Sequence, residues 1–152
     1  MLLTHLKGLV IQNKKVLFLC TGNSCRSQIA EGLAKKYLNN CTIESAGTNP
    51  EAVNPIAIEV MREIDIDLSN HYSKSITDEQ IKSFDIAITL CGDAKDKCLN
   101  ITSLVKQHIH WDIIDPAKAT GTNEEKLNIY KSVRNLIEIK IKDLYKSLTN
   151  SS

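Results

Sequence analysis

Residues 20–27 have the residue types and the spacing that suit nucleophilic attack on a tetrahedral oxyanion. Cys20 and Arg26 form a C-x5-R pattern in a loop of small residues, between an apolar strand-like run and the start of a helical pattern. Backbone N–H groups of such a loop can turn inward, and the positive end of the helix dipole adds to their attraction for an anion. Arg26 can offer a planar fork to two oxygens. We therefore expect Cys20 to attack an oxyanion that Arg26 helps to hold.

The loop between this thiol and the helix is expected to form the anion site. Gly22 is predicted to allow a positive φ. The positive field of the loop favours the thiolate of Cys20, which is the attacking species. Ser27 has two interpretations, a hydrogen-bond partner of that thiolate or a plain N-cap of the helix. The residues expected to bind the oxyanion are Thr21, Gly22, Asn23, Ser24, Cys25, Arg26 and Ser27.

Two further cysteines, Cys91 and Cys98, enclose a polar segment that follows an apolar run. A disulfide needs Cα atoms about 4.4–6.8 Å apart. A relay in which Cys91 changes partner from Cys20 to Cys98 therefore requires this segment to rearrange. Lys95 and Lys97 would favour thiolates and thiol exchange nearby. The alternative interpretation is two free cysteines in a loop.

Asp115, directly before Pro116, is a candidate general acid. A carboxylic acid on a loop near the anion site could protonate a leaving oxygen. The alternative is ordinary turn chemistry, because Asp-Pro is common in turns.

The cysteine count and the charge balance argue against several classes of protein. Five cysteines cannot all pair within one chain, which favours a reducing compartment such as the cytosol. Their C-x4-C and C-x6-C spacings lack the close pairs of a zinc ribbon. A formal net charge of +1 gives no reason to expect nucleic acid or an anionic membrane as a partner. The chain has no convincing signal peptide and no run approaching about 18 apolar residues, so we expect a soluble protein.

Strands alternate with helices along the chain, which predicts a single α/β domain. The expected strands are residues 16–19, 41–45, 85–90 and 107–111, and the expected helices are residues 27–38, a helix capped by Asn54 and Pro55, residues 77–82, and a helix from the capping box of Thr122 and Glu125 to residue 148. We expect a four-stranded parallel sheet with helices on both faces. Ligands of such sheets bind beyond the carboxyl ends of the strands. Cys20 and Cys91 each follow an expected strand, so both thiols should face one site.

Several motifs occur in the order found in the thioredoxin-coupled arsenate reductases, which the chain resembles from about residue 14 to about residue 145. They are residues 16–27 with Gln28, Ala30 and Glu31, then Ser45-Ala46-Gly47, Asn54-Pro55, Asp65-Ile66-Asp67, Thr89-Leu90-Cys91, Cys98, and His110-Trp111 through Asp115-Pro116. The resemblance implies the low-molecular-weight tyrosine phosphatase fold. It divides the chain into an N-terminal extension, residues 1–13, and an arsenate reductase domain, residues 14–148. Nothing in the sequence suggests an obligate dimer, so we expect a monomer.

The resemblance also implies a mechanism. Cys20 displaces an oxygen of arsenate, with Asp115 as general acid. Cys91 then attacks the arseno-cysteine, and arsenite leaves as the Cys20–Cys91 disulfide forms. Cys98 takes over the bond to Cys91, and thioredoxin reduces the Cys91–Cys98 pair, while Cys25 stays outside the relay. Phosphate and sulfate would compete with arsenate, and no tightly bound cofactor is expected.

Some members of this family bind a potassium ion beside the loop. Asn23, Glu31 and Ser45 match oxygen ligands of that site, but the threonine and aspartate of a later stretch are Tyr72 and Lys74 here. A missing carboxylate and an added ammonium disfavour a cation, so no metal is expected. We hypothesise that Lys74 takes the place of the ion and supports Glu31 directly. The alternative is a solvated Lys74.

Other functions would use the same residues. A tyrosine or small-molecule phosphatase would need only Cys20, Arg26 and Asp115, but phosphatases of this fold resemble C-x-G-N-x-C-R-S-P, whereas Gln28 follows Ser27 here. Weak phosphatase activity would be compatible with the loop. A non-enzymatic oxyanion or redox sensor is disfavoured because the chain contains no recognisable DNA-binding or output element. A variant coupled to mycothiol or glutaredoxin is closer, although a third relay cysteine favours thioredoxin.

Overall fold

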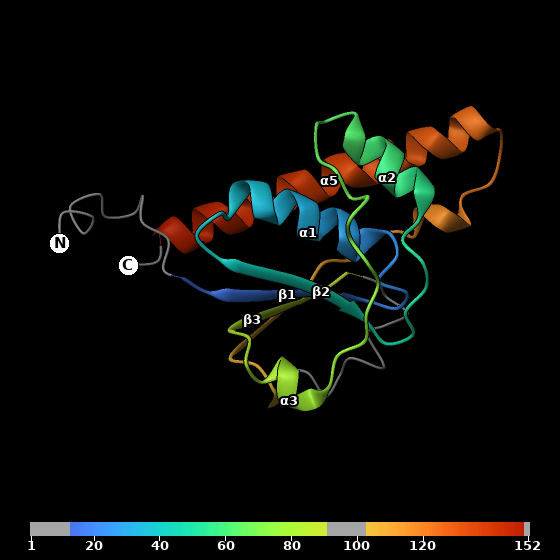
Figure 1. Cartoon of the computed structure of the whole chain (residues 1–152). Helices are drawn as coiled ribbons and strands as arrows, with labels where there is room; N and C mark the ends of the chain where they lie inside the picture. Colours follow the sequence, from blue (N-terminus) through green and yellow to red (C-terminus); the bar gives the residue numbers. More distant parts are fainter. Residues whose placement is uncertain (1–12, 91–102, 151–152) are drawn as a thin grey trace.

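Strand β1 (Lys15–Cys20) is central because its apolar run is buried on both faces. The computed structural model describes residues 13–90 and 103–150. In these residues β1 lies between β2 (Thr42–Gly47) and β3 (Ile86–Thr89), and β4 (Gln107–His110) follows β3, giving the order β2-β1-β3-β4. All three pairings are parallel. The expected four-stranded parallel sheet is confirmed (Figure 1).

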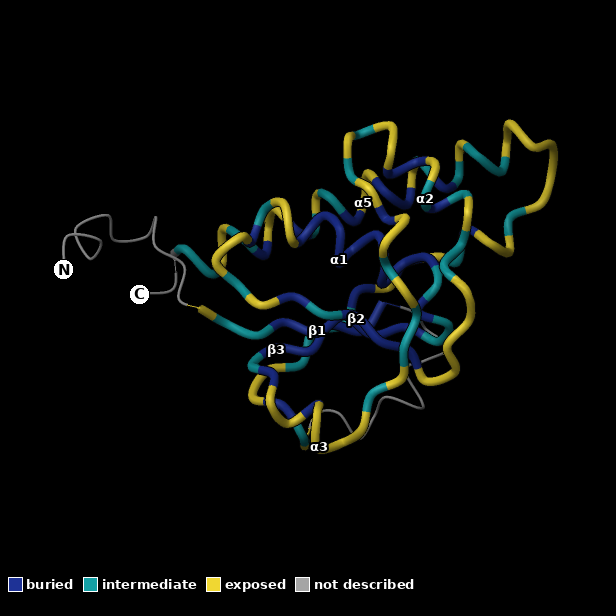
Figure 2. Tube along the Cα trace, in the orientation of Figure 1, coloured by how far each residue is buried: buried dark blue, intermediate teal, exposed yellow. Residues whose placement is uncertain are grey.

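Helices cover the two faces of this sheet unequally. The helices α1 (Arg26–Tyr37), α2 (Pro55–Arg62) and α5 (Asn123–Asn150) lie on one side, and the four-residue α3 (Asp78–Ile81) lies on the other (Figures 1 and 2). A short 3-10 turn, η3 (Pro116–Lys118), precedes α5. The expectation of helices on both faces is confirmed, with most of the helical mass on the α5 side. No helix among residues 13–90 and 103–150 is long and apolar enough to cross a membrane.

The long helix α5 closes the core with the apolar stripe that its sequence predicted. Residues spaced by three or four along α5 face the sheet side because such residues share one face of a helix. Those that are buried are Tyr130, Val133, Ile137, Ile141 and Leu144, while Leu127 and Leu148 pack partly buried against the same core. Leu136 and Ile139, which fall between these positions, are exposed.

Most predicted helix starts are confirmed, and one is displaced. Asn54 caps α2, Thr77 and Gln80 form a capping box at α3, and Thr122 and Glu125 exchange the equivalent bonds before α5. The first helix was expected to begin at Ser27, but α1 begins at Arg26 with Cys25 as its N-cap residue.

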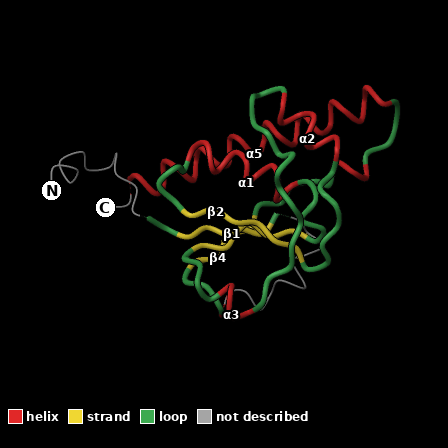
Figure 3. Tube along the Cα trace, in the orientation of Figure 1, coloured by secondary structure: helices red, strands yellow, loops and turns green. Residues whose placement is uncertain are grey.

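The carboxyl ends of β1 and β3 are neighbours in the sheet, which places a site where the fold class predicts one. Figure 3 shows the strands running together in one layer, with loops at their ends. Leu19 is paired with Thr89, and the backbone N–H of Leu90 donates to the carbonyl of Leu19 at 3.0 Å. The expected relay cysteines Cys91 and Cys98 lie outside the described residues, as do residues 1–12 of the expected extension.

Candidate active site

The thiol of Cys20 lies at the end of β1 in a pocket of about 290 Å³. Cys20 is only 3% exposed, and its Sγ lies 2.9 Å from the Oγ of the fully buried Ser27. The pocket is therefore the place where the sequence-predicted nucleophile meets solvent. Its lining residues are Cys20, Thr21, Gly22, Ser24, Cys25, Arg26, Glu51, Asp115, Ala117 and Lys118.

Ser27 links the Cys20 thiol to the buried side chain of Asn23. Asn23 Oδ1 accepts the backbone N–H of Lys74 at 3.0 Å, which fixes the orientation of the Asn23 amide. The Nδ2 of Asn23 then donates to Ser27 at 2.8 Å and to Ser45 at 2.9 Å. Because Ser27 accepts this bond, its own hydroxyl hydrogen can be directed at Cys20. Ser27 is thus a hydrogen-bond partner of the Cys20 sulfur, and the N-cap interpretation is wrong because Cys25 holds that position. Stabilisation of a thiolate by Ser27 stays a prediction.

The carbonyl groups of the anion loop are held by a neighbouring segment, residues 48–54, which we call the collar. Its backbone N–H groups donate to one loop carbonyl after another, and the helix takes over where the loop ends. The donor and acceptor pairs are Thr48 to Cys20 (3.3 Å), Asn49 to Thr21 (2.8 Å), Glu51 to Gly22 (2.8 Å) and Asn54 to Ser24 (2.8 Å), followed by Ile29 to Cys25 (2.9 Å) within the start of α1.

Because peptide bonds are planar, the bonds from the collar also fix the direction of the loop N–H groups. In a trans peptide the N–H points away from the carbonyl, and the described residues contain no cis peptide bond. Because the carbonyls of residues 20–22 and of residue 24 face the collar, the N–H groups of residues 21–23 and of residue 25 face the opposite side, where the loop lines the pocket. A ring of N–H groups beside the N-terminus of α1 is the arrangement that binds oxyanions.

Two residues allow the loop and the collar to approach so closely. Asn23, not Gly22, is the loop residue with a positive φ, at 48°, so the prediction for Gly22 is wrong. Asparagine tolerates this region, and its amide is held there by three hydrogen bonds. At Gly47 a Cβ would lie 2.6 Å from the carbonyl oxygen of Thr21 and 2.8 Å from the nitrogen of Asn23, so no side chain fits.

Arg26 and Asp115 face each other across the pocket. Arg26 is 8% exposed, its Nη1 donates to the carbonyl of Ile113 at 2.9 Å, and its Nη2 lies 3.7 Å from Asp115 Oδ2. Asp115 Oδ1 accepts the N–H of Ala117 at 3.0 Å and caps η3. The turn interpretation of Asp115 is confirmed through Oδ1, whereas Oδ2 lies beside Arg26 and Asp115 lines the pocket, so the general-acid role stays a prediction.

Cys25, the second cysteine of the loop, does not have the properties of a nucleophile. Burial, helped by the charges of Asp115 and Cys20, raises the pKa of the Cys25 thiol to about 12. Cys25 is therefore protonated at neutral pH and contributes its backbone to the loop rather than a nucleophile.

The residues expected to match a cation site bind one another instead. Ser45 donates to Glu31 Oε1, and Lys35 donates to Glu31 Oε2 at 2.6 Å. Burial raises the pKa of Glu31, but the hydrogen bonds from Lys35 and Ser45 outweigh burial and leave the pKa below its ordinary value. With Asn23 Oδ1 bonded to a backbone N–H, these oxygens are satisfied by protein donors, so the arrangement does not fit a potassium ion.

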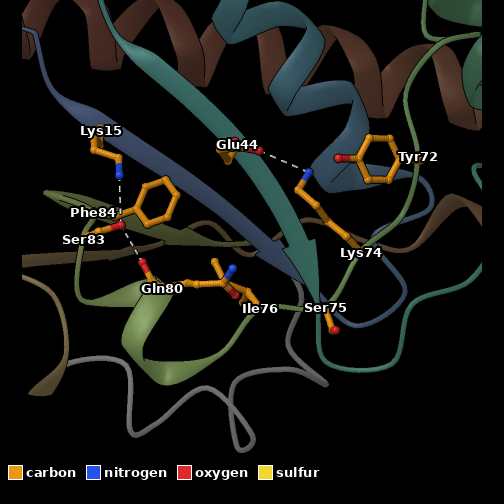
Figure 4. Close-up of a pocket in the computed structure, with 9 residues that line it drawn as sticks. All are labelled: Lys15, Glu44, Tyr72, Lys74, Ser75, Ile76, Gln80, Ser83 and Phe84. Atoms are coloured by element: carbon orange, nitrogen blue, oxygen red, sulfur yellow. Dashed lines mark hydrogen bonds and ion pairs between the residues drawn. The ribbon is translucent and has the colours of Figure 1, made fainter.

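The hypothesis that Lys74 supports Glu31 directly is wrong. Lys74 Nζ lies 3.3 Å from Glu44 Oε1 and over the ring of Tyr72, in a cavity of about 400 Å³ between the sheet and α3 (Figure 4). Lys35, one turn after Glu31 on α1, takes the role expected of Lys74. Among the described residues that line this larger cavity there is no cysteine, whereas the smaller pocket is lined by Cys20 and Cys25.

Several supporting residues were missed by the sequence reasoning. The collar, the need for Gly47 and the contacts of Gln28 and Ser73 with the loop had no local pattern, although Gly47 and Gln28 occur in motifs of the resemblance. The structure brings together Cys20, Arg26, Ser27 and Asp115 as predicted. Cys91 and Cys98 fall outside the described residues.

Comparisons with known proteins agree with the fold and the loop. The family model of low molecular weight phosphotyrosine protein phosphatase matches residues 15–152. An arsenate reductase of Oceanobacillus iheyensis is 48% identical over 133 residues, covering 87% of this chain and 95% of that protein. The arsenate reductase of Bacillus subtilis strain 168 is 46% identical over 134 residues, covering 88% and 96%.

Solved structures give the same assignment. An arsenate reductase in the phosphate binding state has a TM-score of 0.76 at 30% identity, over 89% of this chain and 98% of that chain. A YwlE arginine phosphatase with a phosphorylated active-site serine has a TM-score of 0.76 at 27% identity, over 90% and 97%. The chain therefore belongs to the low molecular weight phosphotyrosine protein phosphatase family, in which these curated relatives are arsenate reductases.

Proposed function

We propose that this protein is an enzyme that reduces arsenate to arsenite. The observation that carries the proposal is the buried Cys20 thiol, 2.9 Å from Ser27, in a loop whose N–H groups and Arg26 suit a tetrahedral oxyanion. Relatives 46–48% identical over nearly their full length are named arsenate reductases. Phosphate and sulfate compete with arsenate because they share its charge and tetrahedral shape.

In the first step the Cys20 thiolate forms a bond to arsenic, and one oxygen leaves. Ser27 stabilises the attacking thiolate by donating its hydroxyl hydrogen. Arg26 and the loop amides hold the remaining oxygens. Asp115 supplies the proton that converts the leaving oxygen to water.

In the second step the Cys91 thiolate attacks Cys20 Sγ. The Cys20–Cys91 disulfide forms, the sulfur–arsenic bond breaks, and its electron pair reduces arsenic from the pentavalent to the trivalent state. Cys98 then attacks Cys91 and releases the Cys20 thiolate. The two electrons that reduce the Cys91–Cys98 disulfide come from thioredoxin, which places the enzyme in a reducing compartment such as the cytosol. Leu90, the last described residue before Cys91, donates its backbone N–H to the carbonyl of Leu19, the residue before Cys20, which is compatible with this step.

Multiple-turnover reduction of arsenate with thioredoxin, its reductase and NADPH tests this function. We expect NADPH oxidation that depends on arsenate and on thioredoxin. A Cys98→Ser variant should complete one turnover and then stop, and Cys41→Ser, outside the relay, should turn over normally. Full multiple turnover by Cys98→Ser would contradict the relay, and the absence of arsenate-dependent NADPH oxidation by the unaltered protein would contradict the function.

The second candidate function is hydrolysis of a phosphate ester, and the same geometry favours it. Cys20, Arg26 and Asp115 could form and break a phosphocysteine, and the arginine phosphatase relative has this fold at 27% identity. Hydrolysis of an aryl phosphate, measured beside arsenate reduction with the same preparation, separates the two. Arsenate reduction predicts that Cys98→Ser leaves any phosphatase activity unchanged, because ester hydrolysis needs no electrons.

A further inference from the structure

Within residues 13–90 and 103–150, no backbone N–H is found to donate to the Asn23 carbonyl of the anion loop. The carbonyl of Asn23 lies between those of Gly22 and Ser24, which bind Glu51 and Asn54 of the collar. Two side chains bind it instead: Gln28 Nε2 donates to it at 3.0 Å, and Ser73 Oγ donates at 2.6 Å. The side chain of Gln28 therefore completes the row of donors that the collar leaves incomplete.

The orientation of the Gln28 side-chain amide follows from its burial and its hydrogen-bond partners. It is fully buried, at 0% exposed, on the first turn of α1. Its Nε2 also donates to the carbonyl of Tyr72 at 3.2 Å, and its Oε1 lies 2.9 Å from His71 Nδ1. Two carbonyls require the amide nitrogen on one side, so the amide oxygen faces His71, whose Nδ1 carries the hydrogen. Every polar atom of the Gln28 amide thus has a partner.

The residue that this amide holds is conformationally strained. Asn23 has a φ of 48°, a region that costs free energy for a residue other than glycine. The bonds from Gln28 and Ser73 to the Asn23 carbonyl offset part of that strain and orient the Asn23–Ser24 peptide, beside the bonds that the Asn23 side chain makes. If that peptide rotates, the N–H of Ser24 no longer faces the pocket that Ser24 lines.

We propose that Gln28 is a positioning residue for the oxyanion: with Ser73 it orients the Asn23–Ser24 peptide so that the Ser24 N–H faces the anion. Gln28 does not touch the substrate. It acts through the loop backbone, by donating to the carbonyl of Asn23. The inference deepens the proposed function, but it concerns anion binding and not electron transfer, so the two can fail separately.

The test replaces the donor and measures affinity for inorganic phosphate. Gln28→Met keeps length and removes the hydrogen bonds, and Ser73→Ala removes the second donor. Protection of Cys20 from iodoacetamide by phosphate, followed by mass spectrometry of the peptide that contains Cys20, reports binding without any turnover. We expect the phosphate dissociation constant to rise about tenfold for Gln28→Met, which corresponds to the loss of one to two hydrogen bonds, and to rise further in the double variant.

The chain supplies matched controls. Gln80 occupies the third position of α3, as Gln28 does in α1, and it also reaches back past its helix start, but it lies far from the loop in the capping box of Thr77. Ser83 donates to the carbonyl of Gln80 at 2.7 Å, as Ser73 does to that of Asn23. Gln80→Met and Ser83→Ala should lower thermal stability at most and leave phosphate binding unchanged.

A purely structural role of Gln28 makes a different prediction. It would lower the melting temperature of Gln28→Met while the folded protein bound phosphate normally, and that result would overturn the proposal. Gln28→Glu sharpens the test, because it keeps an acceptor for His71 but turns the donor at Asn23 into an acceptor. It should bind phosphate no better than Gln28→Met, and affinity equal to that of the unaltered protein would also overturn the proposal. Absence of arsenate reduction would leave these outcomes unaffected.

Discussion

Helices α1 and α2 begin in opposite ways, although both start at the same end of the sheet beside the anion loop. At α2, Asn54 Oδ1 accepts the N–H groups of Ile56 and Ala57 at 2.8 and 3.3 Å, and Pro55 has no N–H to satisfy. At α1, the cap residue Cys25 makes no side-chain hydrogen bond to the helix. The first N–H groups of a helix need partners. The Asn54 side chain satisfies N–H groups at the start of α2, whereas the first N–H groups of α1 have no side-chain cap and can bind an anion.

The capped helix also holds the uncapped one. Asn54 caps α2 with its side chain and donates its backbone N–H to the carbonyl of Ser24. Its Nδ2 donates to Tyr130 of α5 at 3.0 Å, so the collar is anchored to the core. In this protein the uncapped start of α1 is therefore held in part by the capped start of α2.

The largest effect should come from removing the nucleophile at the uncapped start. Cys20→Ser is expected to abolish arsenate reduction, because a serine hydroxyl is not ionised at neutral pH and Ser27 has no thiolate to stabilise. Phosphate should still bind, since the loop N–H groups and Arg26 remain. Single-turnover arsenite formation and a phosphate titration measure the two properties, with Cys41→Ser as the control. Arsenite formation by Cys20→Ser would mean that another group attacks arsenate.

The next effect should come from the contact between β2 and the loop. Gly47→Ala places a Cβ 2.6 Å from a backbone oxygen, so the loop must move, at a cost of about 1–3 kcal/mol in the free energy of unfolding. Phosphate affinity should fall as well. Urea unfolding and phosphate protection of Cys20 measure these changes. In the control, Gly32→Ala, the Cβ would meet side-chain atoms of Ile66 and Leu68 at 3.0 Å, so only stability should change.

Opening the capped helix should affect stability more than binding. Asn54→Ala is expected to lower the free energy of unfolding by about 1 kcal/mol through loss of the cap. Its backbone N–H can still hold Ser24, so phosphate binding should change little. Thr77→Ala, at the cap of the exposed four-residue α3, is the matched variant and should have a smaller effect. A large loss of phosphate affinity in Asn54→Ala at unchanged stability would reverse the roles we assign to the two helix starts.

The smallest effect at neutral pH concerns the thiol of Cys25. Burial raises its pKa from 9.0 to about 12. A group whose pKa is raised in the folded protein contributes stability that is complete below the unfolded pKa and is lost as the pH rises through the folded pKa. Stability should therefore fall between pH 9 and pH 12, and Cys25→Ala should make that fall shallower. Unfolding in urea at pH 8 and pH 10.5 measures the difference, and an identical pH dependence in both proteins would contradict this role of burial.

The position of each helix and strand was predictable where local chemistry decides it. The caps at Asn54, Thr77 and Thr122 follow from residue types a few positions apart, and the stripe of α5 follows from helical spacing. The predicted start of α1 was one residue too late, because no side chain caps this helix and the sequence therefore carries no capping signal. The partner of Glu31 was also assigned wrongly. Lys35 was within reach by helical spacing, but only the packing of the segment around Lys74 shows that its ammonium turns to Glu44.

The sequence by itself determined the fold class and the family, and it predicted Cys20 as the nucleophile and Arg26 as its partner, because these depend on residue types and spacing within short segments. Only the tertiary structure decided how the anion loop is held. The collar, Gln28 and Ser73 come from segments up to 50 residues from the loop, and what they bind are loop backbone carbonyls, which every residue type has. Gly47 contributes by having no side chain. A pattern of side chains cannot report which carbonyl a distant N–H will find. The sequence therefore predicts the loop before α1 as a motif, but the geometry of that loop is set by contacts that form only in the folded chain.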